Sequence, residues 1–589
     1  ECFNLDKVLP NDNPKFRHAV LDRARSMYER DKNHPSILIW SCGNESFGGE
    51  TLFEMSEYFR EADPRRIVHY EGVFNDRRNN QISDIESQMY TPADKVAQYL
   101  DEHDDKPFIL CEYAHAMGNS NGALHKYTDL VDLYPQYQGG FIWDFVDQAI
   151  LKNGKLHYGG DFQERPSDFD FCGNGIVFAN RSLTPKMQEV KYCYQPISFS
   201  FEEEEVVIKN RHLFTNLNVY DLRFSLAYEG KVIAEFSDVI DCQPQASVTV
   251  ALPFLEEMTA FGEYTITVSA LLHEDTIYAQ AGYEVAFDQV VYATAKKEVS
   301  ATKINALRIS YDGFNVGAVG ENFHVFFNMK GLTDYTYASK AYLHGRIARP
   351  NFFRPATQND TANQYGFRYG RWQSASLYQQ IIYQGYRTDE NRTYLEVMYK
   401  HILWPDDESY VDVVYRVDSF GAVEIDMTLH PSEKTIEAPE FGYMMSMPLD
   451  FEEVTYYGYG PEENYVDRIH GARLGIFSYD IDDNFTPYLM PQECGNRCGV
   501  RKAWISDGQN HVLEITSDVC ELSVLRYLPN EIDNATHFDE LPIPYQTVVR
   551  INAMQMGIAG DNTWGAKTHD EYLLPKNEEL HFRFKIKGY

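Results

Sequence analysis

The chain has 589 residues, of which 43% are hydrophobic, and its 53 Lys and Arg against 88 Asp and Glu give a formal net charge of −35. Nucleic acids and anionic membranes both attract basic protein surfaces, so we expect neither as a partner. At about 100–200 residues per domain, this length predicts several domains with buried cores.

The first 190 residues predict alternating helices and strands. Apolar residues at helical spacing predict the helices, and short apolar runs between them predict the strands. The predicted helices are 14–32, 50–62, 92–103 and 121–133, and the predicted strands are 36–40, 66–70, 107–113 and 139–145. Repeated β-α units with short connections indicate a parallel sheet, either open or closed into a barrel.

From about residue 195 the sequence alternates polar and apolar residues in short runs, such as EEVVIKN (204–210) and EYTITVSALL (263–272). This pattern predicts a small antiparallel sandwich of about 95 residues. Strand patterns continue to the end, for example in HFRFKIKGY (581–589), and predict one large β-sandwich. The predicted domains are therefore 1–194, 195–294 and 295–589.

The nine Cys are odd in number and scattered, so we expect reduced thiols and a cytoplasmic location. Cys494 and Cys498 have no second pair nearby, and a structural zinc site is not expected. Neither a membrane helix nor a signal peptide is predicted, because no run of about 18 apolar residues exists and the first residues are polar. The absence of a starting Met predicts that the chain begins inside a longer product.

Two glutamates follow predicted strands, Glu45 in SILIWSCGNES and Glu112 in PFILCEY. In a parallel β/α barrel the carboxyl ends of all strands open onto one face, which holds the active site. Paired carboxylates there suit glycoside hydrolysis, in which one protonates the leaving oxygen and the other attacks the anomeric carbon or activates water. The competing interpretation is structural, since acidic residues commonly cap helices at strand-to-helix turns.

Other residues that suit sugar binding fall at the same strand ends. His115 follows Glu112, Trp143 and Asp144 end GGFIWDF, and Tyr90 ends SQMY. Aromatic rings bind flat sugar faces, and polar side chains bind hydroxyl groups. Pattern alone also allows a core position for Trp143 and a structural role for His115.

Three segments are distinctive: NHPSILIWSCGNES (33–46), ILCEYAHAMGNS (109–120) and QGGFIWDFVDQ (138–148). They resemble family 2 glycoside hydrolases, and more closely the large cytoplasmic β-galactosidases of the bacterial lactose-operon type. The similarity continues through YGGDF (158–162), FCGNGIVFANR (171–181), NDTANQYG (359–366), GYGPEENYVDR (458–468) and MGIAGDNTW (556–564). Glucuronidases and mannosidases of the family differ in CEYAHAMGNS, so the resemblance favours galactosides.

This resemblance implies part of an eight-stranded TIM barrel, followed by an Ig-like β-sandwich and a large C-terminal β-sandwich. It implies a retaining double-displacement hydrolysis of terminal non-reducing β-D-galactosides such as lactose, with Glu112 as nucleophile and Glu45 as acid/base. The implied substrate contacts are Asn44 at the 2-hydroxyl, Tyr90 at the nucleophile, His115 at a hydroxyl, Trp143 under the galactose and Trp564 under the leaving group.

The resemblance also implies two metal ions. Glu45 matches a ligand of Mg²⁺, and Glu1 falls near the place of a second one, although no His stands where a further ligand is expected. Phe171, through its carbonyl group, and Asn174 match ligands of Na⁺ near the sugar 6-hydroxyl. The implied assembly is a homo-oligomer, or a complex with a complementing N-terminal chain.

The sequence is shorter than the family pattern, and four predicted β/α units cannot close an eight-stranded barrel. Three interpretations stay open: the C-terminal part of a longer enzyme, one subunit of a split enzyme, or a chain whose front end was lost. We expect weak or no activity from the isolated polypeptide, because half the wall of the site is absent. Two competing hypotheses for its function are a non-catalytic carbohydrate-binding or assembly module and a family 2 enzyme for another β-glycoside.

Overall fold

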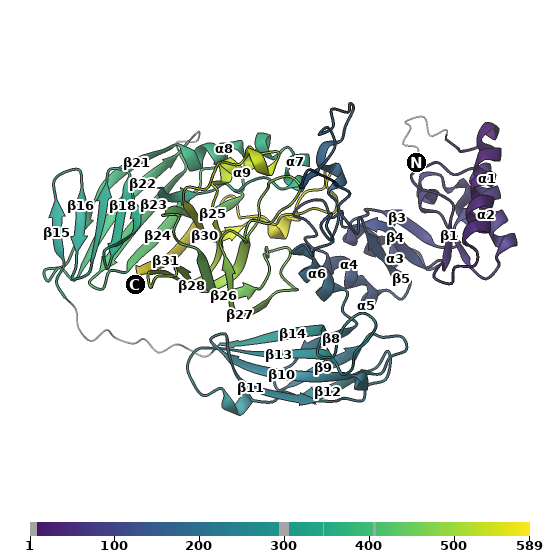
Figure 1. The fold of residues 1–589 in the computed structure, drawn as a ribbon, viewed down its shortest axis with the longest axis horizontal. Coiled ribbons are helices and arrows are strands. Elements are labelled where there is room, and N and C mark those ends of the chain that lie inside the picture. The colour runs from purple at the N-terminus through teal and green to yellow at the C-terminus, as the bar shows by residue number, and fades with distance from the viewer. Residues whose placement is uncertain (1–8, 294–304, 346, 405–407) are drawn as a thin grey trace.

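The computed structural model describes residues 9–293, 305–345, 347–404 and 408–589. Figure 1 shows a part built from helices and short strands at the N-terminal end, a small β-sandwich beside it, and a large β-sandwich that holds the C-terminus. Glu1 lies outside the described residues. Within the residues described, no helix has the length and apolar character needed to cross a membrane.

The N-terminal part contains five parallel strands that follow one another in chain order. β1 pairs with β2, β3 with β4, and β4 with β5, while His69 Nε2 and Ser87 Oγ lie 2.7 Å apart and connect β2 to β3. This order is that of successive strands in a β/α barrel, of which these strands form a part. Their bounds are β1 Ile39–Ser41, β2 Ile67–His69, β3 Glu86–Met89, β4 Phe108–Tyr113 and β5 Tyr137–Ile142.

Six α-helices accompany these strands: α1 Pro14–Asp31, α2 Glu50–Ala62, α3 Ala93–Glu102, α4 His125–Thr128, α5 Leu130–Leu133 and α6 Lys186–Cys193. The first three confirm the predicted helices. The fourth prediction, 121–133, is wrong in its first turn, because Asn121 and Ala123 have left-handed φ values of 61° and 58°. A right-handed helix cannot include that geometry, so α4 begins only after it. A hairpin of β6 (Ile150–Lys152) and β7 (Lys155–His157) follows β5.

The small sandwich confirms the predicted antiparallel fold for this stretch. A three-stranded sheet (β12-β9-β8) packs on a four-stranded sheet (β11-β10-β13-β14), and the alternate inward residues Leu222, Phe224, Ile266 and Val268 are fully buried between them. The bounds are β8 Ile197–Phe201, β9 Glu205–Asn210, β10 Tyr220–Tyr228, β11 Lys231–Asp238, β12 Ser247–Ala251, β13 Glu263–Leu272 and β14 Glu284–Ala293.

The large sandwich contains a five-stranded sheet, β15 to β19, and a twelve-stranded sheet, β20 to β31. Residues of both sheets share one hydrophobic core. The first sheet comprises β15 Arg308–Tyr311, β16 Val316–Val319, β17 Phe323–Asn328, β18 Gly331–Tyr337 and β19 Lys340–His344. The second comprises β20 Ala348–Asn351, β21 Gln379–Arg387, β22 Tyr394–Leu403, β23 Tyr410–Asp418, β24 Val423–His430, β25 Glu440–Met447, β26 Glu453–Gly460, β27 Arg473–Asp480, β28 Asn496–Ser506, β29 Val512–Leu525, β30 Thr547–Gln555 and β31 Leu580–Gly588.

Among the described residues, three α-helices accompany the large sandwich: α7 Gln358–Ala362, α8 Tyr365–Leu377 and α9 Pro529–Asp533. The sequence did not predict α8, because YGFRYGRWQSASL contains two Gly and many aromatic residues, which are weak helix formers. Tertiary packing stabilises this helix instead, since Tyr365, Tyr369 and Trp372 are buried along one face.

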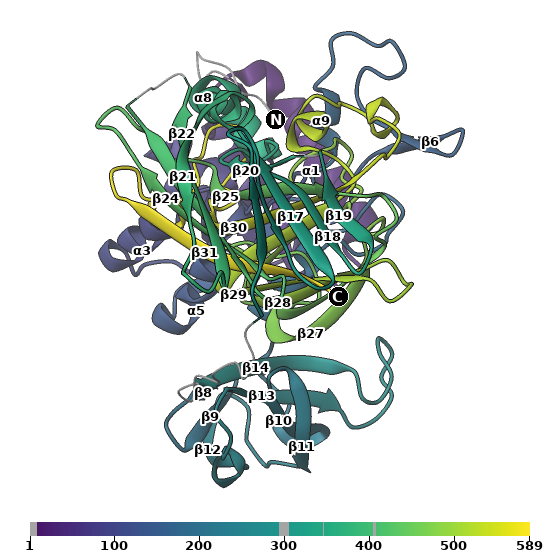
Figure 2. The same ribbon diagram turned by 90° about the vertical axis from the view of Figure 1, so that its left-hand side faces the viewer.

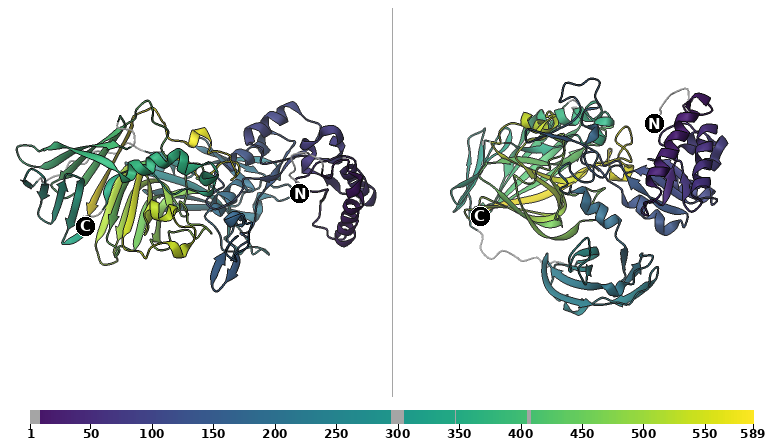
Figure 3. Two further views of the ribbon diagram at one scale, coloured as in Figure 1. Left: turned by 90° about the horizontal axis from the view of Figure 1, so that it is seen from above. Right: turned by 45° about the vertical axis from the view of Figure 1, so that its right-hand side comes forward.

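The three parts contact one another through ion pairs and loops. Arg501 of β28 pairs with Glu263 of β13, and Arg473 of β27 pairs with Glu284 of β14, so the small sandwich rests on one edge of the large one (Figure 2). Seen from above, α1 and α2 lie at the end of the molecule opposite the large sandwich (Figure 3). The predicted domain limits themselves stay predictions.

Candidate active site

A cavity of about 690 Å³ lies at the carboxyl ends of the parallel strands. Glu45 follows β1, Tyr90 follows β3, Glu112 lies near the end of β4, and Trp143 follows β5. The structure therefore brings together eight residues that the sequence singled out, whose roles stay predictions. The cavity is lined by Asn44, Glu45, Phe74, Met89, Tyr90, Glu112, His115, Trp143, Phe171, Asn562 and Trp564.

Tyr90 connects two neighbouring strand ends. Its hydroxyl group donates a hydrogen bond of 2.8 Å to Glu112 Oε2, and its backbone N–H donates to the Glu112 carbonyl at 2.9 Å. Burial raises the pKa of Tyr90, and the Glu112 carboxylate raises it further, so the phenol stays protonated and donates. A donor held against one oxygen fixes the direction of the Glu112 carboxylate.

The backbone around these groups is strained. Glu45, Tyr90 and Ala114 have left-handed φ values of 46°, 51° and 47°. Such positions cost about 1–3 kcal/mol each and persist where the surrounding structure fixes them, most often at functional sites. Glu45 is one of the two carboxylates, Tyr90 is hydrogen-bonded to the other, and Ala114 lies two residues after it, which supports a functional reason for their geometry.

Glu71 is a third carboxylate at this place, which the sequence did not single out. It follows β2, is buried, and its Oε1 accepts a hydrogen bond from the Glu45 backbone N–H. Burial raises the pKa of Glu71 to about 7, with repulsion from Glu45 and Glu112 adding to the effect. The position of Glu71 after RIVHY repeats that of Glu112 after its own strand, so the same strand-end argument could have found it.

His115 is buried between aromatic side chains. Its ring stacks on Phe171 at a centroid distance of 5.4 Å and meets the edge of Trp564 at 5.1 Å, while its Nδ1 lies 2.6 Å from Thr563 Oγ1. Burial lowers the pKa of His115 to about 4, so the imidazole is neutral at pH 7. A neutral ring offers one donor and one acceptor, which suits recognition of a hydroxyl group.

Trp564 reaches the cavity from the large sandwich and meets Tyr90 at a right angle, with 4.5 Å between ring centroids. Helix α7 holds the loop that carries it. Asn359 Nδ2 donates to the carbonyl groups of Asn562 at 2.6 Å and Ala566 at 2.9 Å. The sequence motifs 359–366 and 556–564 are thus neighbours in space.

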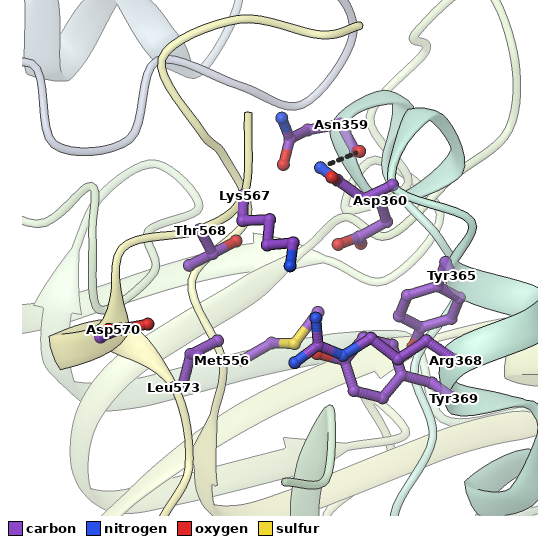
Figure 4. Close-up of a pocket in the computed structure, with 11 residues that line it drawn as sticks. Asn359, Asp360, Tyr365, Arg368, Tyr369, Met556, Lys567, Thr568, Asp570 and Leu573 are labelled. Atoms are coloured by element: carbon purple, nitrogen blue, oxygen red, sulfur yellow. Dashed lines mark hydrogen bonds between the residues drawn. The ribbon is translucent and has the colours of Figure 1, made fainter. Parts of the chain in front are cut away.

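A smaller cavity of about 120 Å³ lies between helices α7 and α8 and the segment 567–573 (Figure 4). The Lys567 side chain points into it, with Asp360 and Arg368 around it. None of the predicted site residues is among those that line this cavity, so we assign it a structural place beside the Trp564 loop.

Lys186 of α6 holds the loop that follows β4. Its ammonium group donates to the carbonyl groups of Ala116 at 2.6 Å, Gly118 at 2.9 Å and Gly175 at 2.7 Å. Burial lowers the pKa of Lys186 to about 7. The three acceptors match the three protons of an ammonium group, so Lys186 stabilises both the His115 loop and the loop after Phe171.

Asn174 lies on that second loop and does not belong to the lining of the main cavity. Its backbone carbonyl accepts a hydrogen bond of 2.6 Å from the Asp144 N–H. Its side-chain Oδ1 is buried and has no hydrogen-bond partner among the described residues. A buried, unpartnered amide oxygen fits the predicted role as a ligand of a hard cation.

Three family models cover most of the chain. Residues 3–199 match the TIM barrel domain of the glycosyl hydrolases family 2, residues 206–293 match domain 4 of beta-galactosidase, and residues 319–586 match the beta galactosidase small chain. The chain belongs to family 2 of the glycoside hydrolases. The described cysteines are all free thiols, as expected.

Several curated bacterial proteins are similar over nearly the whole chain. It is 41% identical to a beta-galactosidase of Halalkalibacterium halodurans, over 98% of this chain and 58% of that protein. It is 40% identical to a beta-galactosidase of Priestia megaterium, over 99% of this chain and 57% of that protein. It is 38% identical to a beta-galactosidase of Streptococcus thermophilus, over 98% of this chain and 59% of that protein. The chain thus spans less than two thirds of the length of these relatives.

Proposed function

We propose that the protein containing this chain hydrolyses terminal β-D-galactosides such as lactose with retention of configuration. The observation that carries the proposal is the cavity at the strand ends in which Glu45, Glu112 and Tyr90 converge. The relatives named beta-galactosidase support galactose as the sugar.

In the first step Glu112 attacks the anomeric carbon while Glu45 gives its proton to the departing glycosidic oxygen. The hydrogen bond from Tyr90 holds the Glu112 carboxylate in line for this attack. In the second step Glu45 takes a proton from water, and the resulting hydroxide displaces the sugar from Glu112. Each carboxylate then returns to its starting state.

Substrate binding uses the aromatic walls of the cavity. We assign Trp143 to the face of the galactose ring and Trp564 to the leaving group, since both line the cavity. Asn44 and the neutral His115 are assigned to sugar hydroxyl groups. These contacts position the anomeric carbon, and such positioning supplies a large part of catalysis.

Two metal ions belong to the proposal. Glu45 would hold Mg²⁺, and the neighbouring carboxylate of Glu71 adds the oxygen character that this hard cation prefers. A bound Mg²⁺ supplies positive charge that offsets repulsion among the carboxylates. Asn174 Oδ1 and the Phe171 carbonyl would hold Na⁺, and the unpartnered buried oxygen of Asn174 supports this assignment.

The test is intact-protein mass spectrometry after incubation with 2-deoxy-2-fluoro-β-D-galactosyl fluoride, which slows the second step and traps the glycosyl-enzyme. We expect a gain of one fluorosugar on the peptide that contains Glu112, and no gain in Glu112→Gln. A protein that carries the whole barrel and gains no label, yet binds galactose, would support the non-catalytic binding module instead. Labelling by the glucosyl or mannosyl reagent alone would indicate another β-glycoside.

The remaining parts of the proposal concern the whole protein. A cytoplasmic location, a homo-oligomer and a complementing N-terminal chain are proposed by family resemblance. Analytical ultracentrifugation tests self-association. A mixture of this chain with a separate N-terminal part tests complementation, through recovery of the fluorosugar label.

A further inference from the structure

Three potential metal ligands meet outside the cavity, at the junction of the N-terminal part and the large sandwich. His125 is the first residue of α4, Glu189 lies on α6, and His470 lies between β26 and β27. One ligand atom from each lies within 4.8 Å of the other two. None of the three residues lines the cavity described above.

Glu189 is fixed in place by its own hydrogen bonds. The carboxylate is 2% exposed; its Oε2 accepts a bond of 2.8 Å from the Gly471 N–H, and its Oε1 lies 3.0 Å from His470 Nδ1. Partners of this kind orient a metal-ligating carboxylate and hold it in one position. A fixed carboxylate therefore faces the two imidazoles.

The two imidazoles lie against each other. Their centroids are 4.0 Å apart, and His125 Nδ1 is buried and has no hydrogen-bond partner within the described part of the chain. An unpartnered ring nitrogen beside a second imidazole and a carboxylate is better explained as a ligand than as a packing group.

We propose that His125, Glu189 and His470 bind one divalent transition-metal ion, for which Zn²⁺ is the best match. Two imidazole nitrogens and one carboxylate oxygen form a common zinc ligand set that leaves the fourth position for water. Both histidines are partly exposed, so the ion and that water can enter. Zinc bonds of about 2.0–2.2 Å place tetrahedral ligands roughly 3.3–3.5 Å apart, and rotation of the two rings closes the remaining gap.

The surrounding charges favour a cation. The carboxylates of Asp129 and Asp288 interact electrostatically with His470. The carboxylate of Glu571 and the ammonium group of Lys126 interact in the same way with His125. With Glu189 these groups amount to four carboxylates and one ammonium. The bound ion would connect α4 and α6 to the segment before β27. It would thereby stabilise the contact between the N-terminal part and the large sandwich.

The protein is first treated with a chelator and dialysed, and Zn²⁺ binding is then measured by isothermal titration calorimetry. The buffer contains excess Mg²⁺, which occupies sites made of oxygen ligands. We expect one tight Zn²⁺ site in the wild type. The variants His125→Ala and His470→Ala should bind Zn²⁺ at that site at least about 100-fold more weakly. This exceeds the decrease in metal affinity that follows removal of a residue that only hydrogen-bonds a ligand. His18→Ala, a change at an exposed histidine of α1, is the matched control and should keep the site.

A second measurement uses the wild type, so it does not depend on the folding of the variants. Co²⁺ in a tetrahedral site with two nitrogen ligands should give intense visible absorption bands, which Zn²⁺ displaces at one equivalent. The absence of tight Zn²⁺ binding, a weak octahedral Co²⁺ spectrum, or full binding by folded His125→Ala and His470→Ala would each overturn the proposal. In those cases the three residues form a metal-free contact between the two parts, stabilised by the hydrogen bond between His470 and Glu189.

Discussion

Glu45 and Glu112 carry the same functional group but have different surroundings. Glu112 accepts the hydroxyl hydrogen bond of Tyr90, which fixes the direction of one oxygen of its carboxylate. Glu45 sits in a left-handed backbone position beside the buried carboxyl group of Glu71. In the proposed mechanism Glu112 attacks the anomeric carbon and Glu45 transfers the proton, so only the role of Glu45 depends on the basicity of the leaving group.

The change Glu45→Gln tests this division of labour. In the protein that carries the whole barrel, and on the proposed function, we expect kcat/KM for lactose to fall by roughly 10²–10⁴-fold, the usual contribution of a general acid. The first step on a dinitrophenyl galactoside should fall much less, because that leaving group departs without a proton. Steady-state and burst kinetics on both substrates measure the difference, with Glu50→Gln, a change at an exposed residue of α2, as the control. Equal losses on both substrates would contradict the assignment.

Much of the candidate site could be predicted from single residues. Glu45, Tyr90, Glu112, His115 and Trp143 all lie at strand ends, where a parallel sheet brings side chains together. Glu71 was missed although it follows β2 in the same way, because the strand-end argument was applied to the other strands and not to RIVHY. Trp564 was assigned through resemblance alone, since no local rule connects a tryptophan of the last sandwich with a barrel strand.

Glu521 of β29 provides a stability prediction at the same scale. It is buried in the large sandwich and accepts a hydrogen bond of 3.2 Å from Asn496 Nδ2. Burial raises the pKa of Glu521 from its ordinary value of 4.5 to about 8. Between these two pH values the unfolded state releases the proton and the folded state keeps it, so stability falls as pH rises.

We therefore expect Glu521→Gln to raise the free energy of unfolding at pH 8 by a few kcal/mol, since one pKa unit corresponds to about 1.4 kcal/mol. At pH 5 the variant and the wild type should be nearly equal. Denaturant unfolding at both pH values measures this, with the exposed Glu453→Gln as control. An unchanged pH dependence would show that Glu521 is ionised in the folded protein.

At the scale of elements, α7 positions the Trp564 loop through Asn359. The change Asn359→Ala leaves the carbonyl groups of Asn562 and Ala566 without this donor. A net loss of about 1 kcal/mol in binding at the Trp564 platform raises KM about fivefold. We expect this rise for lactose with little change in kcat, and Asn534→Ala, an exposed asparagine bonded to Asn530, should have no effect. A fall in kcat at constant KM would contradict the platform role.

The elements themselves differ in how far the sequence predicts them. Helices α1 to α3 and most strands of the small sandwich follow from periodicity, because each packs one face against the core, whereas β11 is exposed along nearly its whole length. Strand β3 (Glu86–Met89) was missed, since ESQM is short, mostly polar and paired only through the strand beside it. Helix α8 was missed because its stability comes from packing against the large sandwich rather than from its own residues.

At the scale of the molecule, the candidate site depends on contact between distant parts of the chain. Tyr127 donates a hydrogen bond of 2.7 Å to Asp561 Oδ1, and the Ala123 N–H donates to the Asp467 carbonyl at 2.6 Å. These contacts join the loop after β4 to the segments around 467 and 561. Two sides of the cavity therefore come from segments more than 400 residues apart in the chain, such as Glu112 and Trp564, and no short sequence pattern could predict this.

Arg468 is the central group of this contact. Its guanidinium donates to Asn119 Oδ1 and the Ser120 carbonyl, both at 2.8 Å, and to Glu463 Oε1 at 3.1 Å. Arg468 and Glu463 are both 1% exposed in their side chains. Removing one partner of such a pair leaves the other charge buried, which costs about 3–5 kcal/mol.

We expect Arg468→Ala to lower the free energy of unfolding by about 3–5 kcal/mol. The variant should also show faster backbone amide hydrogen exchange in both 115–121 and 461–470. The exposed Arg583→Ala should change neither. The double change Arg468→Met and Glu463→Gln should recover part of the loss, because no unpaired charge stays buried. Faster exchange confined to 461–470 would contradict the coupling, since the loop that carries His115 would then be held without the large sandwich.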